Sequence, residues 1–329
     1  MRAISYTQFG PASDVLELSE LPTPSAGPGE VLVRLTYSGV NPSDAKARAG
    51  ARPGVTKPAF DRIIPHSDGA GVIEAVGDGV DMGRIGQNVW IWNGQWQRAF
   101  GTGAEYIALP SDQAVVLPGA VSLQTGATLG IPGLTAAHTV FGGGDVSGQT
   151  LLISGGAGAV GHTAVQLAKW GGARVIATCS AGSADRVRAA GADHVLDYRS
   201  DTLVADIMQA TDGHGIDRAV EVEFGQNAAM LPDVMRPNST VAAYGSGKEM
   251  APTLPFGPYL FKAITIDIVL IYLLPDAQRH AAITRLHAAL GAGGLRAEIG
   301  AVYDLAEAAI AHDAVMMPGR TGAVLLRTS

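Results

Sequence analysis

The chain has 329 residues, of which 47% are hydrophobic and 16% charged, and this composition excludes a disordered protein. Its formal net charge of −7 argues against a general nucleic-acid surface, and no uncharged apolar stretch reaches the roughly 18 residues of a membrane span. The N-terminus lacks the apolar core of a signal peptide, and a single cysteine excludes an internal disulfide. These features predict a cytoplasmic protein with two domains.

The first 120 or so residues are expected to be rich in β-strands. Val31, Val33 and Leu35 alternate with more polar residues, as they do in a strand with one buried face. Further strands are predicted over 71–77 and 88–92, and proline and glycine interrupt the region often. Short strands separated by turns are typical of a compact β-barrel.

A glycine-rich turn is the most informative segment of the chain. An apolar run over 150–154 is followed by Gly156-Ala157-Gly158-Ala159-Val160-Gly161, then by a helical pattern and a second apolar run over 173–178. The pattern strand, glycine turn, helix, strand holds a dinucleotide pyrophosphate at the helix N-terminus. The turn therefore indicates a redox enzyme and locates its cofactor.

Strands and helices alternate from there to the end of the chain. This alternation predicts a doubly wound parallel sheet. The expected helices cover 184–190, 201–210 and 277–290, and the expected strands cover 194–197, 217–222, 240–244, 264–273 and 323–327.

The end of the second strand bears on the choice of cofactor. An NAD site usually has a carboxylate there for the ribose 2′-hydroxyl, whereas this chain has Cys179-Ser180. Ser180 and Ser183 can donate hydrogen bonds to a 2′-phosphate and Arg186 can supply positive charge, so NADPH is favoured. The alternative for Arg186 is a solvated helix residue. Cys179 ends a buried strand, and a packed thiol is favoured over a nucleophile.

Six short motifs, in order, resemble those of the medium-chain dehydrogenase/reductase superfamily and, within it, the zinc-free quinone oxidoreductases of the zeta-crystallin type. They are residues 39–44, 71–77, 103–106, 130–136, 155–161 and 320–324. The resemblance implies a GroES-like β-barrel domain over 1–123 and 276–329, and a Rossmann domain over 124–275. It also implies a homodimer or homotetramer, with pairing near 264–273.

The residue types do not support a zinc site. The first cysteine ligand of zinc-dependent relatives falls at Asn41, their His-Glu pair is replaced around His66, and their four-cysteine lobe is absent. Without a Lewis acid, a simple ketone is hard to polarise, whereas quinones and α,β-unsaturated carbonyls accept hydride directly. His66 is expected to line the substrate pocket or to make a supporting hydrogen bond.

The resemblance also implies most of the site residues. Asn41 is expected near the nicotinamide and substrate, although Asn-Pro also forms a turn by itself, and a helix cap is favoured over an acid for Asp44. Lys46 stands where relatives often have a tyrosine that contacts the cofactor. The remaining cofactor residues are Thr135, the turn 156–161, Tyr198, Phe224, Gly225, Gly245, Ser246, Val269, Leu270 and Arg320, for which a surface role is the alternative.

A tryptophan-rich segment over 90–100 departs from many relatives. Trp90 and Trp92 share one strand face, where core packing is the default, although Trp92 is also a candidate pocket residue. Trp96 and Phe100 lie beyond a turn and are expected to overhang the substrate as an aromatic lid for a flat, apolar acceptor.

The leading functional expectation is an NADPH-dependent reductase of quinones that needs no zinc. A reductase of alkenals or enones is the alternative within enzymes, because it needs the same hydride geometry. A non-catalytic dinucleotide-binding or structural protein is the alternative of another class. The expected partner is a small apolar electron acceptor, with neither nucleic acid nor membrane.

Overall fold

The computed structural model describes residues 1–51 and 54–329, which divide into two compact units. The first unit consists of Met1–Ile131 and Ala297–Ser329, and the second of Pro132–Arg296. Both boundaries differ from those expected at residues 124 and 276. Helix α11 (Asp276–Gly291) belongs to the second unit because it packs against helices α4 (Leu134–Phe141) and α5 (Ala159–Trp170).

The first unit is built around the long strand β3 (Glu30–Val40), which pairs antiparallel with β4 (Asp68–Val76), β6 (Tyr106–Pro110) and β15 (Ala323–Arg327). The predicted alternation is confirmed, since Val31, Val33 and Leu35 are buried in one apolar core. Smaller elements complete the β-rich part. They are β1 (Arg2–Ser5), α1 (Ala12–Val15), β2 (Glu17–Glu20), α2 (Pro42–Arg48), η1 (Met82–Arg84), β5 (Asn88–Ile91), η2 (Ser111–Gln113), β7 (Ala114–Val116), α3 (Leu123–Gly126) and η3 (Leu129–Gly133).

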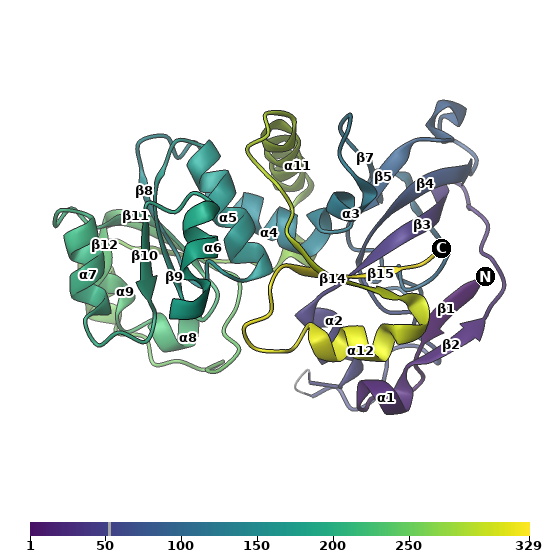
Figure 1. The fold of residues 1–329 in the computed structure, drawn as a ribbon, viewed down its shortest axis with the longest axis horizontal. Coiled ribbons are helices and arrows are strands. Elements are labelled where there is room, and N and C mark those ends of the chain that lie inside the picture. Colours follow the sequence, from purple (N-terminus) through teal and green to yellow (C-terminus); the bar gives the residue numbers. More distant parts are fainter. Residues whose placement is uncertain (52–53) are drawn as a thin grey trace. The chain divides into compact units, whose positions relative to one another are not determined.

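The C-terminal segment returns to the first unit. Strand β14 (Ile299–Asp304) pairs parallel with β15, which lies against β3, and η6 (Leu305–Glu307) leads into α12 (Ala308–Ala314) (Figure 1). Helix α12 shares an apolar core with residues from β1, β3 and α2. The first unit is therefore assembled from both ends of the sequence.

The second unit contains a parallel sheet with the strand order β10-β9-β8-β11-β12-β13. The chain runs outward from β8 in one direction and then from β11 in the other, so the order reverses between these two strands. The strands are β8 (Thr150–Ile153), β9 (Arg174–Cys179), β10 (His194–Asp197), β11 (Ile216–Glu221), β12 (Met235–Ala243) and β13 (Thr265–Ile268). The predicted doubly wound parallel sheet is confirmed.

The strand expected over 264–273 is shorter than predicted. Strand β13 ends at Ile268, and η5 (Ile271–Leu273) turns the chain away. The N–H of Val269 still bonds Ala243 O at 2.8 Å, but the next backbone bond, from Leu273 N to Leu270 O, closes a local turn. The apolar run over 264–273 thus contains both a short strand and a single helical turn.

Small helices fill the connections of the second unit. In α5 the buried positions are Gly161, Ala164, Val165, Leu167 and Ala168, so one apolar face meets the sheet as expected, except that Val160 is only partly buried. The other elements are η4 (Ala181–Ser183), α6 (Ala184–Ala189), α7 (Leu203–Ala210), α8 (Phe224–Asn227), α9 (Leu231–Val234) and α10 (Phe256–Phe261).

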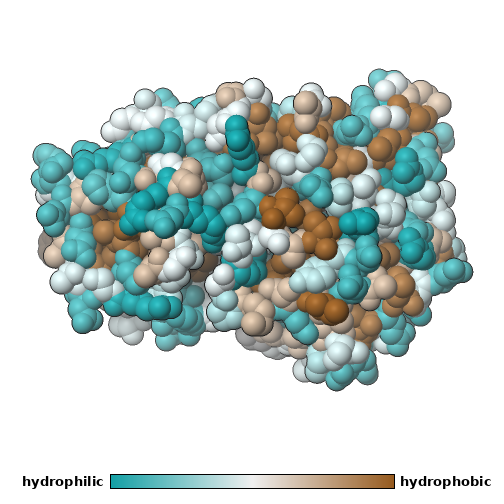
Figure 2. Space-filling model, viewed as in Figure 1, coloured by the Kyte–Doolittle hydropathy of each residue, from teal (hydrophilic) through white to brown (hydrophobic). Residues whose placement is uncertain are grey.

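The surface mixes polar and apolar residues. On the face shown in Figure 2, hydrophobic residues form separate brown areas among hydrophilic ones. Within the described ranges, every helix is too short or too polar to cross a bilayer.

Candidate functional site

The glycine-rich turn connects β8 to α5, and its backbone requires glycine at specific points. Gly155 has a φ of +67°, which side chains disfavour. A Cβ on Gly156 would lie 3.0 Å from the Cβ of Ala177, and a Cβ on Gly161 would lie 2.2 Å from Gly155 O. The last contact is too short for any side chain, so the tight turn depends on Gly161.

The start of α5 has the properties of an anion site. Gly158 is the N-cap residue and, as a glycine, has no side chain to cap the helix. The first N–H groups of the 12-residue helix lack partners inside it, and the helix dipole is positive there. Among the described residues, a Cβ on Gly158 would meet Gly155 O alone, at 3.4 Å, which leaves open space beside the turn. The turn Gly156, Ala157, Gly158, Ala159, Val160 and Gly161 therefore fits a dinucleotide pyrophosphate.

Ser180, Ser183 and Arg186 lie together after β9, next to this turn. The hydroxyls of Ser180 and Ser183 are 3.4 Å apart. Nη2 of Arg186 donates to Ala157 O at 2.7 Å, so the arginine is more than a solvated helix residue. It supports the turn and brings positive charge beside it.

Tyr198 follows β10, and the preceding Asp197 pairs with Cys179 in the sheet. The hydroxyl of Tyr198 accepts hydrogen bonds from Arg199 Nε at 3.1 Å and Nη2 at 2.9 Å, and the guanidinium lies 4.9 Å from the ring centroid. Sequence reasoning did not consider Arg199, although a basic residue directly after Tyr198 was a visible signal of positive charge just beyond β10.

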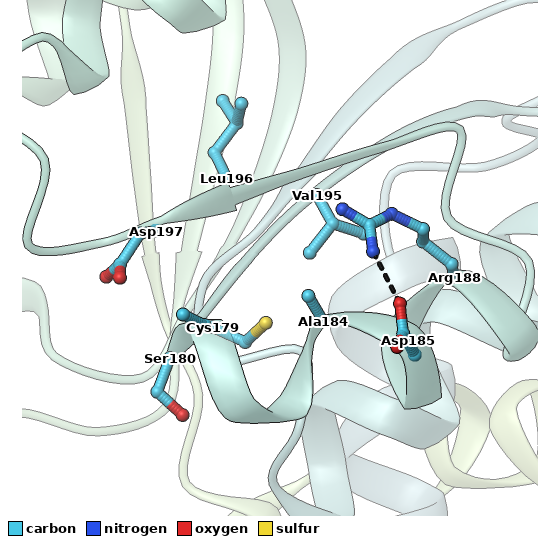
Figure 3. A pocket seen from close by; sticks show the side chains of 9 residues that line it. Cys179, Ser180, Ala184, Asp185, Arg188, Val195, Leu196 and Asp197 are labelled. Atoms are coloured by element: carbon cyan, nitrogen blue, oxygen red, sulfur yellow. Dashed lines mark hydrogen bonds and ion pairs between the residues drawn. The ribbon is translucent and has the colours of Figure 1, made fainter.

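A pocket of about 350 Å³ lies where β9 and β10 end (Figure 3). Asp197 borders it, and an ion pair of 2.7 Å joins Asp185 to Arg188 at its rim. Cys179 is buried, and burial and Asp197 raise the pKa of its thiol. The burial agrees with the packed thiol that the sequence favours over a nucleophile. Asp197 is a carboxylate near the strand ends that the sequence pattern missed.

The later strands of the sheet bring four further candidates together. Phe224 N donates to Gly245 O at 3.0 Å, and Gly225 N donates to Ser246 Oγ at 2.8 Å. These bonds join the segment after β11 to the segment after β12. Both segments lie at the carboxyl ends of parallel strands, where ligands bind in this architecture.

The other candidates of the second unit lie on separate elements. Val269 is buried and its N–H is used within the sheet, whereas Leu270 is exposed. Thr135 is buried near the start of α4, where its carbonyl accepts from Thr139 Oγ1 at 2.7 Å. The structure thus leaves the side chain of Leu270 accessible and those of Val269 and Thr135 enclosed.

Asn41 is held between two buried carboxyl groups of the first unit. Its N–H donates to Asp44 Oδ2 at 2.8 Å at the start of α2, which confirms the helix cap expected for Asp44. Its side-chain Nδ2 donates to Asp68 Oδ2 at 2.7 Å, and Asp68 Oδ1 accepts from Ile131 N at 2.8 Å. Asn41 therefore has a fixed side chain, and Asp68 is a site residue that sequence reasoning missed.

Both carboxyl groups are perturbed by their surroundings. Burial raises the pKa of Asp44 to about 7. Burial and then the neighbouring Asp44 raise the pKa of Asp68 well above its usual range, against the hydrogen bonds that it accepts. Carboxyl groups with a raised pKa are common at functional sites.

His66 is fully buried and has a φ of +78°, a rare conformation for a residue with a side chain. Its Nδ1 lies 2.8 Å from Ser38 Oγ, and its Nε2 lies 2.8 Å from Nε2 of His312. Of its two expected roles, the supporting hydrogen bond agrees with this environment. Its partner is 246 residues away in the sequence, and no local signal announced it.

The hydrogen bonds fix where the protons of this chain of groups lie. Thr102 Oγ1 donates to the carbonyl of Asp68 at 2.6 Å, so Ser38 must donate to Thr102, 2.9 Å away, and accept from Nδ1 of His66. Nε2 of His66 then accepts from His312. Nδ1 of His312 carries a lone pair and is buried with no partner among the described residues.

The remaining candidates of the first unit are less enclosed. Lys46 is exposed on α2, and Arg320 Nε donates to Val315 O at 2.9 Å within its own segment. Trp90 is fully buried, whereas Trp92 is half-buried and its Nε1 donates to Asp112 O at 3.2 Å. Trp96 is half-buried, and Phe100 is 49% exposed on a segment paired with Ile64.

Metal-ligating residue types are dispersed in the part of the chain that the structure describes. Over 1–51 and 54–329, no three histidine, cysteine, aspartate or glutamate side chains are grouped closely enough to hold a metal ion.

Two family models match the chain. Residues 27–119 match "Alcohol dehydrogenase GroES-like domain", and residues 159–288 match "Zinc-binding dehydrogenase". The chain is 30% identical to human quinone oxidoreductase over 335 residues, covering 99% of this chain and 97% of that protein. It is also 30% identical to the human synaptic vesicle membrane protein VAT-1 homolog, covering 74% of this chain but 61% of that longer protein.

Solved structures share this fold over the whole chain. A mycobacterial protein solved in complex with NADPH is 25% identical with a TM-score of 0.86, covering 99% of this chain and 100% of that one.

Proposed function

Because this chain belongs to the medium-chain dehydrogenase/reductase superfamily, and within it to the zeta-crystallin-like quinone oxidoreductases, we propose that it reduces quinones with NADPH and without zinc. The observation that carries this proposal is the glycine turn, where open space meets the N–H groups at the start of α5, which have no partner within the helix. Bound NADPH supplies the hydride, and the electron-poor acceptor needs no Lewis acid.

The donor set supports the absence of zinc from the proposed reaction. A catalytic zinc needs thiolate, imidazole or carboxylate ligands with one open position. Position 41 is an asparagine bonded to Asp68, and the single cysteine, Cys179, is buried in strand β9. His66 uses both ring nitrogens in hydrogen bonds to Ser38 and His312.

We assign to Asn41 the role of orienting the acceptor. One N–H of its amide is held by Asp68, which leaves the second N–H to donate to a carbonyl oxygen of a quinone. Fixing the rotamer in advance lowers the cost of this contact during hydride transfer. The half-buried Trp96 and exposed Phe100 offer aromatic surface to a flat acceptor.

The function is tested by NADPH oxidation at 340 nm with 1,4-benzoquinone, 9,10-phenanthrenequinone and 2-alkenals, with EDTA throughout and NADH in parallel. Quinone turnover that prefers NADPH and ignores EDTA is the expected result. Turnover of alkenals but not of quinones would instead support a reductase of activated double bonds. Tight NADPH binding without turnover of any acceptor would favour a non-catalytic role, and loss of activity in EDTA would contradict a zinc-free reaction.

The preference for NADPH is expected to depend on Arg199. The Arg199→Ala variant should bind NADPH about tenfold more weakly, because a charged donor to the 2′-phosphate is lost, while NADH affinity stays unchanged. Arg186→Ala should weaken NADPH more than NADH as well, and it should also weaken NADH because the bond to Ala157 O is lost. Fluorescence titration of both cofactors checks this, and equal losses in Arg199→Ala would exclude Arg199 from the phosphate site.

We also propose a homodimer joined along β13. This strand is the edge of its sheet, Ile268 is 80% exposed on it, and Phe261 is 88% exposed nearby. Ile268→Lys should shift the mass in sedimentation analysis to that of a monomer. Met82→Lys, which also replaces an exposed apolar residue by lysine but lies on η1, should not. An unchanged mass in Ile268→Lys would remove β13 from the interface.

A further inference from the structure

Glu221 is a buried carboxyl group at the point where the strand order of the parallel sheet reverses. It ends β11, while Ser154 directly follows β8, and these two strands are neighbours in the sheet. Ligands of doubly wound sheets bind at this reversal, beyond the carboxyl ends of the strands. Glu221 is only 1% exposed, so it does not meet a ligand itself.

Three hydrogen-bond donors from two segments converge on this carboxyl group. Oε1 accepts from Glu223 N at 2.6 Å and from Asn227 Nδ2, on α8, at 3.0 Å. The side chain of Ser154 donates to it as well. A buried group with several partners fixes the geometry of all of them, because a buried polar group left without a partner is costly.

The same two segments also touch through their backbones. Gly155 follows Ser154 and begins the glycine-rich turn, and a Cβ on it would lie 2.9 Å from Cγ1 of Val222. Ser154 N donates to Val220 O at 2.9 Å, just before Glu221. A shift of the segment after β11 would therefore move the start of the turn.

We infer that Glu221 is a positioning residue for the dinucleotide, which holds the glycine turn and the segment 222–227 in register so that the N–H groups of α5 face the pyrophosphate. The inference rests on the proposed use of NADPH. Groups that bind a ligand lose affinity when the residues behind them are free to move, since the binding geometry is no longer preformed.

Two substitutions of similar size separate this role from the charge of Glu221. In Glu221→Gln the amide oxygen still accepts from Glu223 N and Asn227, and the amide nitrogen can donate to the hydroxyl of Ser154. In Glu221→Leu all three donors lose their acceptor. The Leu variant should bind NADPH at least about tenfold more weakly, and the Gln variant should stay within about threefold of the wild type.

The control is Thr211→Val, a buried change before the amino end of β11. Thr211 Oγ1 accepts from Gly215 N at 3.1 Å and donates to Met208 O at 3.0 Å, so its loss destabilises the same unit away from the strand ends that bind ligand. It should lower the unfolding temperature and leave the Kd of NADPH unchanged. If Glu221→Leu does not fold, Ser154→Ala removes one of the three bonds and should raise the Kd about threefold.

The measurements are NADPH titration by calorimetry and unfolding temperature with and without NADPH, both independent of turnover. A folded Glu221→Leu with the wild-type Kd, or a Ser154→Ala with the wild-type Kd where the Leu variant is unfolded, would overturn the inference. A Gln variant as weak as the Leu variant would also overturn it, since the charge would then be the cause. Wild-type protein that does not bind NADPH would refute the proposed function instead.

Discussion

Replacing Gly161 by alanine is expected to weaken NADPH binding by about a hundredfold. The new Cβ would lie 2.2 Å from Gly155 O and 3.0 Å from the Cα of Gly156, and both neighbours are backbone atoms that cannot rotate away. The turn must open to relieve this contact, and the N–H groups at the start of α5 then no longer point toward the pyrophosphate. Fluorescence titration of NADPH measures the change, and circular dichroism reports whether the variant is folded.

A matched control lies at the end of α11 in the same unit. Gly291 has no described heavy atom within 4 Å of a Cβ built on it, and its φ is not positive. Gly291→Ala should therefore bind NADPH like the wild type. Equal binding by the Gly161→Ala and wild-type proteins would show that the turn tolerates a side chain and would contradict the packing argument.

The second large effect concerns the buried histidine pair in acid. Burial, followed by the charge of Arg48, lowers the pKa of His312 to about 4, and burial and His312 lower that of His66. Both histidines ordinarily take up protons near pH 6.5 when the chain is unfolded. The unfolded state therefore binds more protons than the folded state between about pH 6.5 and 4, and stability falls as the pH falls through this window.

The His312→Gln variant isolates this contribution. Between pH 7 and 4.5 the wild type should lose roughly 2 kcal/mol more unfolding free energy than the variant, as urea unfolding at both values would measure. Asp44, whose pKa is raised to about 7, changes stability in the opposite direction with pH in both proteins and so cancels in the comparison. Parallel pH profiles would mean that His312 protonates in the folded state as easily as in the unfolded chain.

Local patterns predicted most of the fold. The alternation around Val33 and the glycine turn are each contained within a dozen residues, and they specified β3 and the β8–α5–β9 unit. The strand predicted over 264–273 was too long. Residues after Val269 are still apolar, but their backbone no longer pairs with the sheet, and hydrophobicity alone does not show this end. Helix α11 was assigned to the wrong unit. Hydrophobic spacing shows that one face of a helix is buried, but it does not show which unit that face packs against.

The candidate site was less predictable, because its supporting residues are distant in the sequence. The contacts of Asn41 with Asp68 and of His66 with His312 span 27 and 246 residues, and no motif joins them. Glu221 ends a strand of otherwise ordinary appearance, and its three partners become visible only when β8 and β11 lie side by side. Sequence periodicity reports burial, whereas these roles arise from the pairing of polar groups.

The return of the C-terminal segment to the first unit constrains the order of events during synthesis. All of Pro132–Arg296 leaves the ribosome before β15 does, so the parallel-sheet unit can complete its core while the first unit still lacks the strand that lies between β3 and β14. Until residues 323–327 emerge, one side of β3 and the apolar face meant for α12 stay uncovered. The part of the first unit that precedes Pro132 is thus synthesised before the second unit but completed after it, and in the interval this β-rich part is exposed to misassociation.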